Sequence, residues 1–176
     1  MNVSILISGF GGQGVLFTGK FLAYEGLLEN KEVTWLPSYG PEMRGGTASC
    51  SVIISDTPIG SPLVPHPDVL IAMNLPSLDR FEDAVVPGGA IFYDSSLIDR
   101  EVRRTDVRAF GIPATKTASD KGFPTLANMI VMGKMLKELA LFPDEAIDHT
   151  IAKVVSAKHQ NLLELNKQAI QLGYGM

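Results

Sequence analysis

The chain has 176 residues, of which 45% are hydrophobic and 19% are charged, and its formal net charge is −4. This length suits one domain with a sizeable core, so we expect a single domain over residues 1–176. The acidic balance argues against broad electrostatic binding to nucleic acid, and the uncharged, apolar stretch of residues 122–133 is too short to cross a bilayer.

Cysteine and histidine are scarce. The single Cys50 cannot form an internal disulfide, and no basic region followed by an apolar one stands at the start, so we expect a cytoplasmic protein. Iron–sulfur clusters usually need four thiolates, and zinc sites need closely spaced Cys or His. His66, His149 and His159 stand far apart in the sequence. We therefore expect no metal site in this chain.

The chain begins with the pattern of a parallel α/β unit. Residues 2–8 form a short apolar run typical of a strand buried on both faces. From Val15 the apolar residues recur at three- and four-residue steps, which predicts a helix that ends near Asn30. Residues 32–36 and 47–55 predict the next two strands, with a polar, glycine-rich loop between them.

The remaining elements complete an α/β pattern. Residues 56–68 are rich in proline and suit a hairpin or an irregular excursion at the sheet edge. Further strands are predicted at residues 68–74, 88–96 and 107–110. Helices are predicted at residues 76–84, 124–141, 143–155 and 157–172. The expected fold class is α/β, with a Rossmann-like, mostly parallel sheet flanked by helices and a helical C-terminal part.

The stretch GFGGQGVLFTGK contains a glycine turn between the first strand and the first helix. Gly9, Gly11 and Gly14 fit G-x-G-x-x-G, in which the glycines permit a tight turn, close approach of a ligand and helix–strand packing. Free amides at the helix start would attract a phosphate or carboxylate. The alternative is that the glycines only solve a packing problem at a sharp corner.

Two nucleotide-binding interpretations of this turn are disfavoured. Binding of NAD needs an acid at the carboxyl end of the second strand, where the sequence has Leu36, Pro37 and Ser38. Gly14, Gly19 and Lys20 match the spacing of a phosphate loop, but they lie inside the predicted helix and Phe21 replaces the metal-binding Ser or Thr.

The loop SYGPEMRGGTAS follows the second strand, at the edge where open α/β sheets place ligands. Arg44 is a permanent cation suited to a carboxylate or phosphate. Gly45 and Gly46 would let backbone amides face a ligand without obstruction by side chains. Alternatively, the loop is simply solvated and Arg44 pairs with Glu42.

Together, GFGGQGV, PSYGPEMRGGTAS, DVLIAMN, PGGAIFYDSS and LANMIVMG closely resemble the gamma subunit of the 2-oxoacid:ferredoxin oxidoreductases, over nearly the whole chain. The resemblance implies a thiamine-diphosphate enzyme that decarboxylates a 2-oxoacid, passes electrons through iron–sulfur clusters to ferredoxin and releases an acyl-CoA. It assigns thiamine diphosphate, Mg²⁺ and the clusters to partner alpha, beta and ferredoxin-like delta subunits, because this chain has neither a GDG motif nor cluster ligands.

The resemblance gives this chain no catalytic residue and a share in the region where coenzyme A enters. The cofactor-binding positions that it marks are Gly11, Gly12, Gln13 and Gly14 as a ligand-facing turn and Tyr39, Glu42, Arg44, Gly45, Gly46 and Thr47 as a loop that closes toward the shared site. For the oxoacid we expect 2-oxoglutarate or a branched-chain acid, with pyruvate next. Ferredoxin would be a partner of this chain only indirectly.

Two other functions stay open at this point: a free-standing nucleotide-binding module or small dehydrogenase, and a structural partner without ligand contact. A subunit should expose a large apolar area, whereas a self-sufficient enzyme should enclose its own pocket. An isolated chain could also form a homodimer through the face meant for another subunit.

Several polar residues predict structural roles. Cys50 is expected to be a small buried side chain, and Asn74 and Asp94 are expected to cap turns. Asn128 stands in an apolar helix and needs a buried partner. The basic cluster of Arg100, Arg103, Arg104 and Arg108 is expected to be solvated, with a partner or coenzyme phosphate as the alternative.

Overall fold

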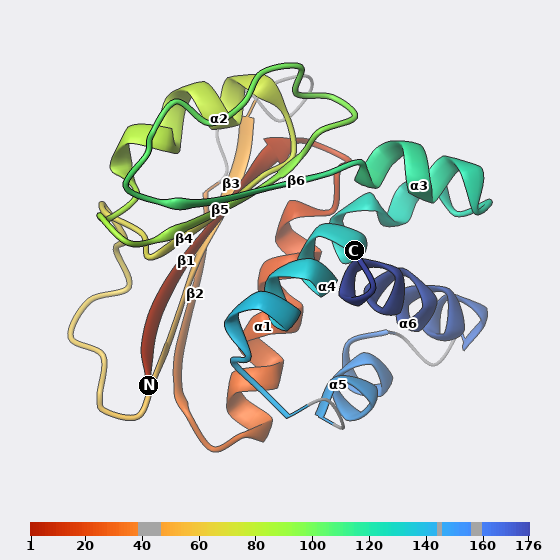
Figure 1. The fold of residues 1–176 in the computed structure, drawn as a ribbon. Helices are drawn as coiled ribbons and strands as arrows, with labels where there is room; N and C mark the ends of the chain where they lie inside the picture. The colour runs from red at the N-terminus through yellow and green to blue at the C-terminus, as the bar shows by residue number, and fades with distance from the viewer. Residues whose placement is uncertain (39–46, 144–145, 156–159) are drawn as a thin grey trace.

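A six-stranded mixed sheet in the order β2-β3-β1-β4-β5-β6 forms the centre of the molecule (Figure 1). The structure is a computed structural model that describes residues 1–38, 47–143, 146–155 and 160–176. The strands are β1 (Asn2–Phe10), β2 (Glu32–Ser38), β3 (Thr47–Ser55), β4 (Val69–Ala72), β5 (Ala90–Asp94) and β6 (Arg108–Ile112). Because β3 runs antiparallel to both β1 and β2 while the other pairs are parallel, all strands except β3 end at one edge.

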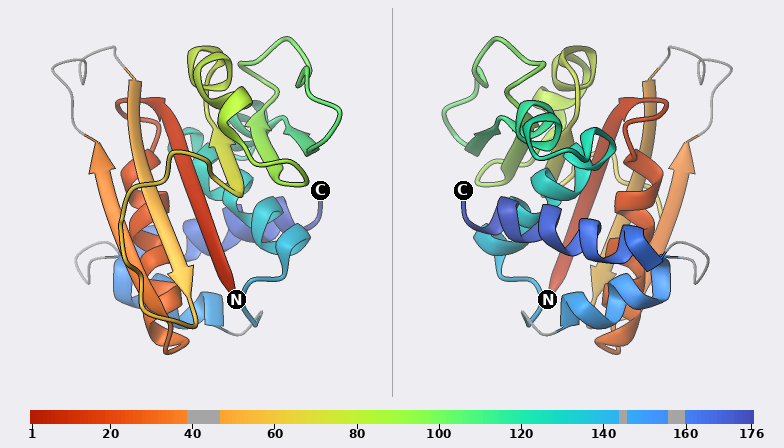
Figure 2. Two further views of the ribbon diagram at one scale, coloured as in Figure 1. Left: turned by 90° about the vertical axis from the view of Figure 1, so that its left-hand side faces the viewer. Right: turned by 90° about the vertical axis from the view of Figure 1, so that its right-hand side faces the viewer.

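Helices cover the two faces of the sheet unequally. The helices are α1 (Val15–Leu28), α2 (Leu75–Phe81), α3 (Ala114–Asp120), α4 (Ala127–Leu139), α5 (Ala146–Val154) and α6 (Gln160–Tyr174), with 3-10 turns η1 (Glu82–Ala84) and η2 (Pro124–Leu126). Among the α-helices of the described residues, α2 alone covers the opposite face (Figure 1). On the larger layer, α5 packs on α1 and α6 packs on α4, with α6 outermost (Figure 2).

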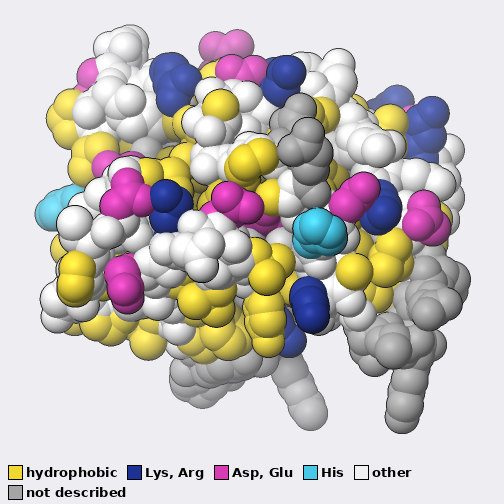
Figure 3. Space-filling model, turned by 90° about the horizontal axis from the view of Figure 1, so that it is seen from below, with side chains coloured by type: hydrophobic (Ala, Val, Ile, Leu, Met, Phe, Trp, Pro, Cys, Tyr) yellow, Lys and Arg dark blue, Asp and Glu magenta, His cyan; other side chains and the backbone are white. Residues whose placement is uncertain are grey.

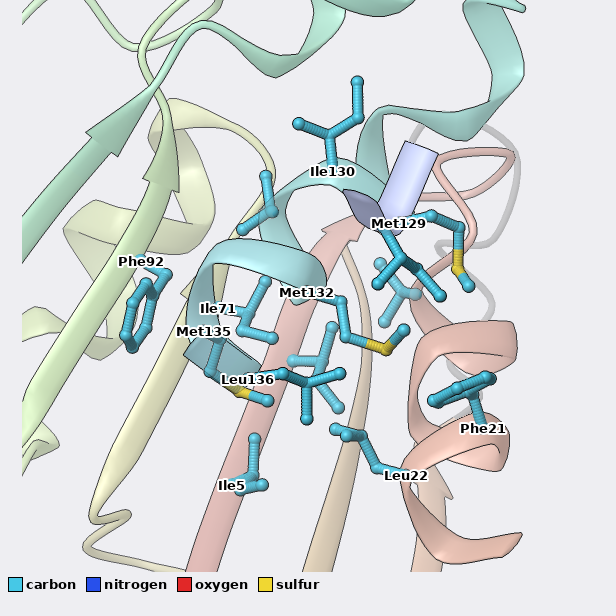
Figure 4. Packing of buried hydrophobic residues seen from close by; sticks show 14 of the residues in the cluster. Ile5, Phe21, Leu22, Ile71, Phe92, Met129, Ile130, Met132, Met135 and Leu136 are labelled. Carbon is cyan, nitrogen blue, oxygen red and sulfur yellow. The ribbon is translucent and has the colours of Figure 1, made fainter. Parts of the chain in front are cut away.

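The main core lies between the sheet and the two inner helices, α1 and α4. Phe21 and Leu22 of α1 meet the α4 side chains Met132 and Leu136 above Ile5 of β1 (Figure 4). These residues are almost completely buried. The α4 sequence is apolar on nearly every side because α4 contacts the sheet, α1 and α6 at once.

The expected fold class is confirmed, with two differences in detail. The proline-rich segment has the irregular form that was one of the two alternatives, but it passes over the face of the sheet opposite α1 and not along the edge (Figure 2). Helix α3 was not expected. Its start is fixed by Asp94, whose carboxylate accepts from the backbone N–H groups of Ala114 and Thr115, and such a distant cap leaves no local signal.

Candidate functional site

The two motif blocks converge at the carboxyl edge of the sheet. Phe10, the last residue of β1, pairs with Thr47, the first residue of β3. Ser38, the last residue of β2, pairs with Ser49. The described ends of the 39–46 loop therefore lie beside the glycine turn. Of the predicted loop residues, Thr47 is described and half-buried, whereas Tyr39, Glu42, Arg44, Gly45 and Gly46 lie outside the described residues.

The glycine turn is a tight reversal closed by Gln13. The Gln13 N–H donates to the Phe10 carbonyl oxygen at 3.1 Å. Gly12 has φ 94°, as the third position of a type II turn requires, and a Cβ there would meet open space. Gly11 and Gly12 are exposed. The backbone of the turn is thus open to a ligand on its outer side.

Helix α1 begins at this turn without a side-chain cap among the described residues. Gly14 occupies the N-cap position with φ 74°. The first amides of an α-helix have no intrahelical partner, and the helix dipole adds positive potential at this end. With 14 residues, α1 is long enough for both effects to operate. The geometry suits a phosphate or carboxylate placed over Gly11 to Gly14.

The Gln13 side chain faces into the fold. Its Oε1 accepts from the backbone N–H of Phe10 at 2.7 Å and from Asn74 Nδ2 at 3.2 Å. Its Nε2 donates to the Met73 carbonyl oxygen at 3.0 Å. Sequence reasoning placed Gln13 among the ligand-facing residues, and the structure shows that its amide is bonded to the ends of β1 and β4.

Asn128 holds the other side of the helix start. Its Nδ2 donates to the Gly14 carbonyl oxygen at 3.2 Å and to Thr18 Oγ1 at 3.0 Å. Thr18 Oγ1 itself donates to the Gly14 carbonyl oxygen at 3.1 Å. The expectation that Asn128 finds a buried partner is confirmed, and α4 thereby fixes where α1 begins.

An apolar cavity of about 300 Å³ lies between α1, α4, α5 and α6. Its lining residues are Gly14, Phe17, Thr125, Leu126, Asn128, Val154, Val155, Leu162 and Asn166. Since none of these side chains is charged, the cavity offers no counter-charge to an anion. The features suited to an anion lie instead at the exposed amides of the turn.

Cys50 and Asn74 have the structural roles expected of them, whereas the basic cluster is solvated only in part, since Arg103 is exposed and Arg100 and Arg104 are largely covered. Cys50 is buried, and desolvation raises the pKa of its thiol to about 12. Asn74 caps α2 by accepting from the Ser77 N–H at 2.9 Å. In the basic cluster, Arg100 pairs with Asp79 and Glu82, and Arg104 pairs with Asp106. Lys20 lies within α1, which confirms that the match to a phosphate loop is accidental.

Comparison with known proteins gives the family. Residues 4–176 match the family model described as pyruvate ferredoxin/flavodoxin oxidoreductase. The ketoisovalerate oxidoreductase subunit VorA of Methanothermobacter thermautotrophicus is 41% identical over 98% of this chain, but the match spans only 36% of VorA. The 2-oxoglutarate synthase subunit KorC of Methanocaldococcus jannaschii is 34% identical, over 95% of this chain and 92% of KorC.

Solved structures share the fold. The gamma subunit of a keto/oxoacid ferredoxin oxidoreductase from Geobacter sulfurreducens superposes with a TM-score of 0.84 at 27% identity, over 98% of this chain and 96% of that one. A 2-oxoglutarate:ferredoxin oxidoreductase from Magnetococcus marinus, with 2-oxoglutarate, coenzyme A and succinyl-CoA bound, gives a TM-score of 0.87 at 25% identity, over 99% of this chain and 30% of that one.

The chain thus corresponds to about a third of some relatives and to nearly the whole length of others. Among the described residues, no helix has the length and apolar character needed to cross a membrane. The family model covers all but the first three residues, and the relatives that match end to end are subunits by name. This chain belongs to the pyruvate ferredoxin/flavodoxin oxidoreductase family.

Proposed function

We propose that this chain is the gamma subunit of a thiamine-diphosphate-dependent 2-oxoacid:ferredoxin oxidoreductase of the cytoplasm, and that its single domain helps to form the coenzyme A region. The observation that carries the proposal is the exposed glycine turn at the start of α1, which lies beside Thr47 at the end of the second motif block. The Magnetococcus marinus relative, described with coenzyme A bound, supports the choice of ligand.

The role of this chain would be anion capture. Amides of Gly11, Gly12 and Gly14 and of the first turn of α1 would hold coenzyme A phosphates, with Arg44 as the fixed counter-charge. Holding the phosphates would orient the thiol toward the acyl group, which lowers the entropic cost of the transfer step. Thiamine diphosphate, Mg²⁺ and iron–sulfur clusters in partner subunits would supply decarboxylation and electron transfer. With one cysteine, this chain cannot hold a four-thiolate cluster.

Exposed apolar side chains support a docked subunit. Tyr24, Leu27 and Leu28 on α1 and Trp35 and Leu36 on the edge strand β2 are all exposed. Figure 3, which looks at the end of the molecule where α1 ends, shows hydrophobic side chains in a band among the charged ones. Apolar surface of this kind is typical of an interaction site. We assign it to the alpha and beta subunits, and an isolated chain could form a dimer there.

The oxoacid is proposed to be a branched-chain 2-oxoacid or 2-oxoglutarate. The VorA relative, at 41% identity, is named for ketoisovalerate, which is a branched-chain 2-oxoacid, and the KorC relative, at 34% identity, is named for 2-oxoglutarate. Purification of the native complex tests the assignment. A brown complex with larger chains that reduces ferredoxin with either acid, and only in the presence of coenzyme A, is the expected result. A colourless chain that is active alone would refute it.

Substitution of Arg44 by Ala tests the anion site within that complex. Loss of one charge-assisted contact should cost roughly 1.5–3 kcal/mol, or about one to two orders of magnitude in coenzyme A affinity. The KM for the oxoacid should change far less. Lys116→Ala is a matched control, because this lysine is exposed on α3 and pairs only with Asp120 in the described structure. Equal affinities for coenzyme A in the Arg44→Ala and Lys116→Ala complexes would contradict the proposal.

A further inference from the structure

A chain of hydrogen bonds, made by polar side chains and one backbone N–H, runs beneath the carboxyl edge of the sheet. It starts at Gln13, continues through Asn74 to Ser77, and reaches Ser8. The Ser8 hydroxyl bonds the Ser77 hydroxyl at 2.9 Å and donates to the Ala48 carbonyl oxygen at a longer 3.4 Å. Ser8, Asn74 and Ser77 are each at most 2% exposed. The chain therefore joins the glycine turn to the first residues of β3 through the interior.

Asn74 is the branch point of this chain. Its Oδ1 accepts from the Ser77 N–H and caps α2, while its Nδ2 donates to Gln13 Oε1. The cap needs only the oxygen, which serine also provides at an N-cap. The bond from Nδ2 is thus an addition that the helix itself does not require, and its sole partner among the described residues is the Gln13 side chain.

Gln13 is tied to both strands that end at the turn. Its side chain bonds the Phe10 N–H on β1 and the Met73 carbonyl oxygen just after β4, and its own N–H closes the turn onto the Phe10 carbonyl oxygen. Gly9 leaves the room for this arrangement, since a Cβ at Gly9 would stand 2.7 Å from Gln13 Oε1. The first glycine of the fingerprint therefore accommodates an amide of the same chain.

We propose that Gln13 is the positioning residue of the anion site and that Asn74 holds it in place. The residues between Phe10 and Gln13 are two glycines, which have wide conformational freedom when unrestrained. Bonds from Gln13 to Phe10 and Met73 fix both ends of the turn before a ligand arrives. The Gly11 and Gly12 amides then bind phosphate with a smaller loss of backbone conformational entropy. This inference rests on the proposed function of the turn.

Three variants of the assembled complex test it. Gln13→Met keeps the size of the side chain and removes its three bonds. Asn74→Ser keeps an uncharged cap for α2 and removes only the bond to Gln13. Both should raise the KM for coenzyme A relative to the KM for the oxoacid, Gln13→Met by roughly threefold to tenfold and Asn74→Ser by less. The double variant should be no worse than Gln13→Met, because Asn74 acts through Gln13.

A merely structural role would lower the melting temperature of the complex and leave the ratio of the two KM values unchanged. That result, or additive effects in the double variant, would overturn the inference. If the Gln13→Met chain does not assemble into the complex, Asn74→Ser alone tests the inference, through the ratio of the KM for coenzyme A to the KM for the oxoacid. Failure of the proposed function is separate: coenzyme A would then leave the Gly11 and Gly12 amides unprotected from hydrogen exchange in the unsubstituted complex.

Discussion

Asn128 on α4 donates a hydrogen bond to the carbonyl oxygen of Gly14, 114 residues earlier in the chain, at 3.2 Å. The Asn128 amide lies directly over the α-carbon of Gly14, where a Cβ would stand 2.6 Å from Asn128 Cγ. Gly14 also has φ 74°, which favours glycine. The third glycine of the fingerprint thus allows α1 to begin under the start of α4.

Gly14→Ala should therefore be more destabilising than an ordinary glycine replacement. The left-handed backbone costs about 1–2 kcal/mol for a residue with a Cβ, and overlap with Asn128 adds to it. Gly88→Ala is the control, because Gly88 has φ 80° and open space around its Cβ position. Urea unfolding of both variants separates the two contributions. Equal losses would show that the Asn128 contact carries no weight.

Glycines also set the close approach of α4 and α6. A Cβ at Gly173 would stand 2.8 Å from the Lys134 backbone nitrogen and overlap the Ile130 carbonyl oxygen. Because these are backbone atoms, Gly173→Ala must push the helices apart. We expect a loss of about 1–3 kcal/mol in the free energy of unfolding, despite the better helix propensity of alanine. A melting temperature at or above that of the unsubstituted chain would contradict this packing.

Glu25 makes the stability depend on pH. Its carboxyl group is fully buried between α1 and α5, where desolvation raises its pKa, opposed by Thr150 and His149 and reinforced by Glu29. In the unfolded chain the pKa is ordinary, so the unfolded state loses its proton first as the pH rises. Stability due to Glu25 is complete below the ordinary carboxyl range and falls as the pH climbs through the raised pKa.

Glu25→Gln should remove this dependence. The variant should be more stable than the unsubstituted chain at pH 8, and the difference should shrink toward pH 4, where Glu25 is mostly protonated in both states. Urea unfolding at pH 8 and at pH 4 measures this difference in stability. Thr150→Ser, which keeps the hydroxyl, is the control for changes in packing. If Glu25→Gln raises the free energy of unfolding by the same amount at pH 8 and at pH 4, the proposed titration of Glu25 is ruled out.

Cys50 should be inert in the folded chain. Its thiol is 1% exposed, donates to the Val15 carbonyl oxygen at 3.4 Å and has a pKa raised to about 12. Thiolate is the reactive form, so a disulfide reagent at pH 8 should label the native chain far more slowly than the chain in urea. Labelling at similar rates in both states would show that the β3–α1 contact opens readily.

Local pattern predicted the strands of this fold, because they are short runs that contain apolar or β-branched residues and are bounded by turn residues. β3, for example, occupies the predicted residues 47–55. The order of the strands and the antiparallel direction of β3 depend on pairings such as Phe10 with Thr47, which no local pattern encodes. Helix α3 was not predicted for a related reason, because the residue that caps it, Asp94, is distant in the sequence.

The candidate site, like the fold, could be predicted from the sequence only in part. The glycine spacing indicated an open turn at a helix start, and the exposed Gly11 and Gly12 agree with it. The inward orientation of Gln13 could not be predicted, because its partners Met73 and Asn74 lie some 60 residues away. A glutamine within a fingerprint is equally compatible with ligand contact and with internal bonding, and only the fold decides between them.

Hydrogen exchange of the glycine turn within the purified complex tests the central claim most directly. Coenzyme A should slow exchange at the amides of Gly11, Gly12 and Gly14, whereas the oxoacid alone should not. The amides of Gly88 and Gly122, exposed glycines remote from the turn in sequence, should exchange at unchanged rates. Unaltered exchange at the turn under saturating coenzyme A would contradict the claim that this chain supplies an anion site.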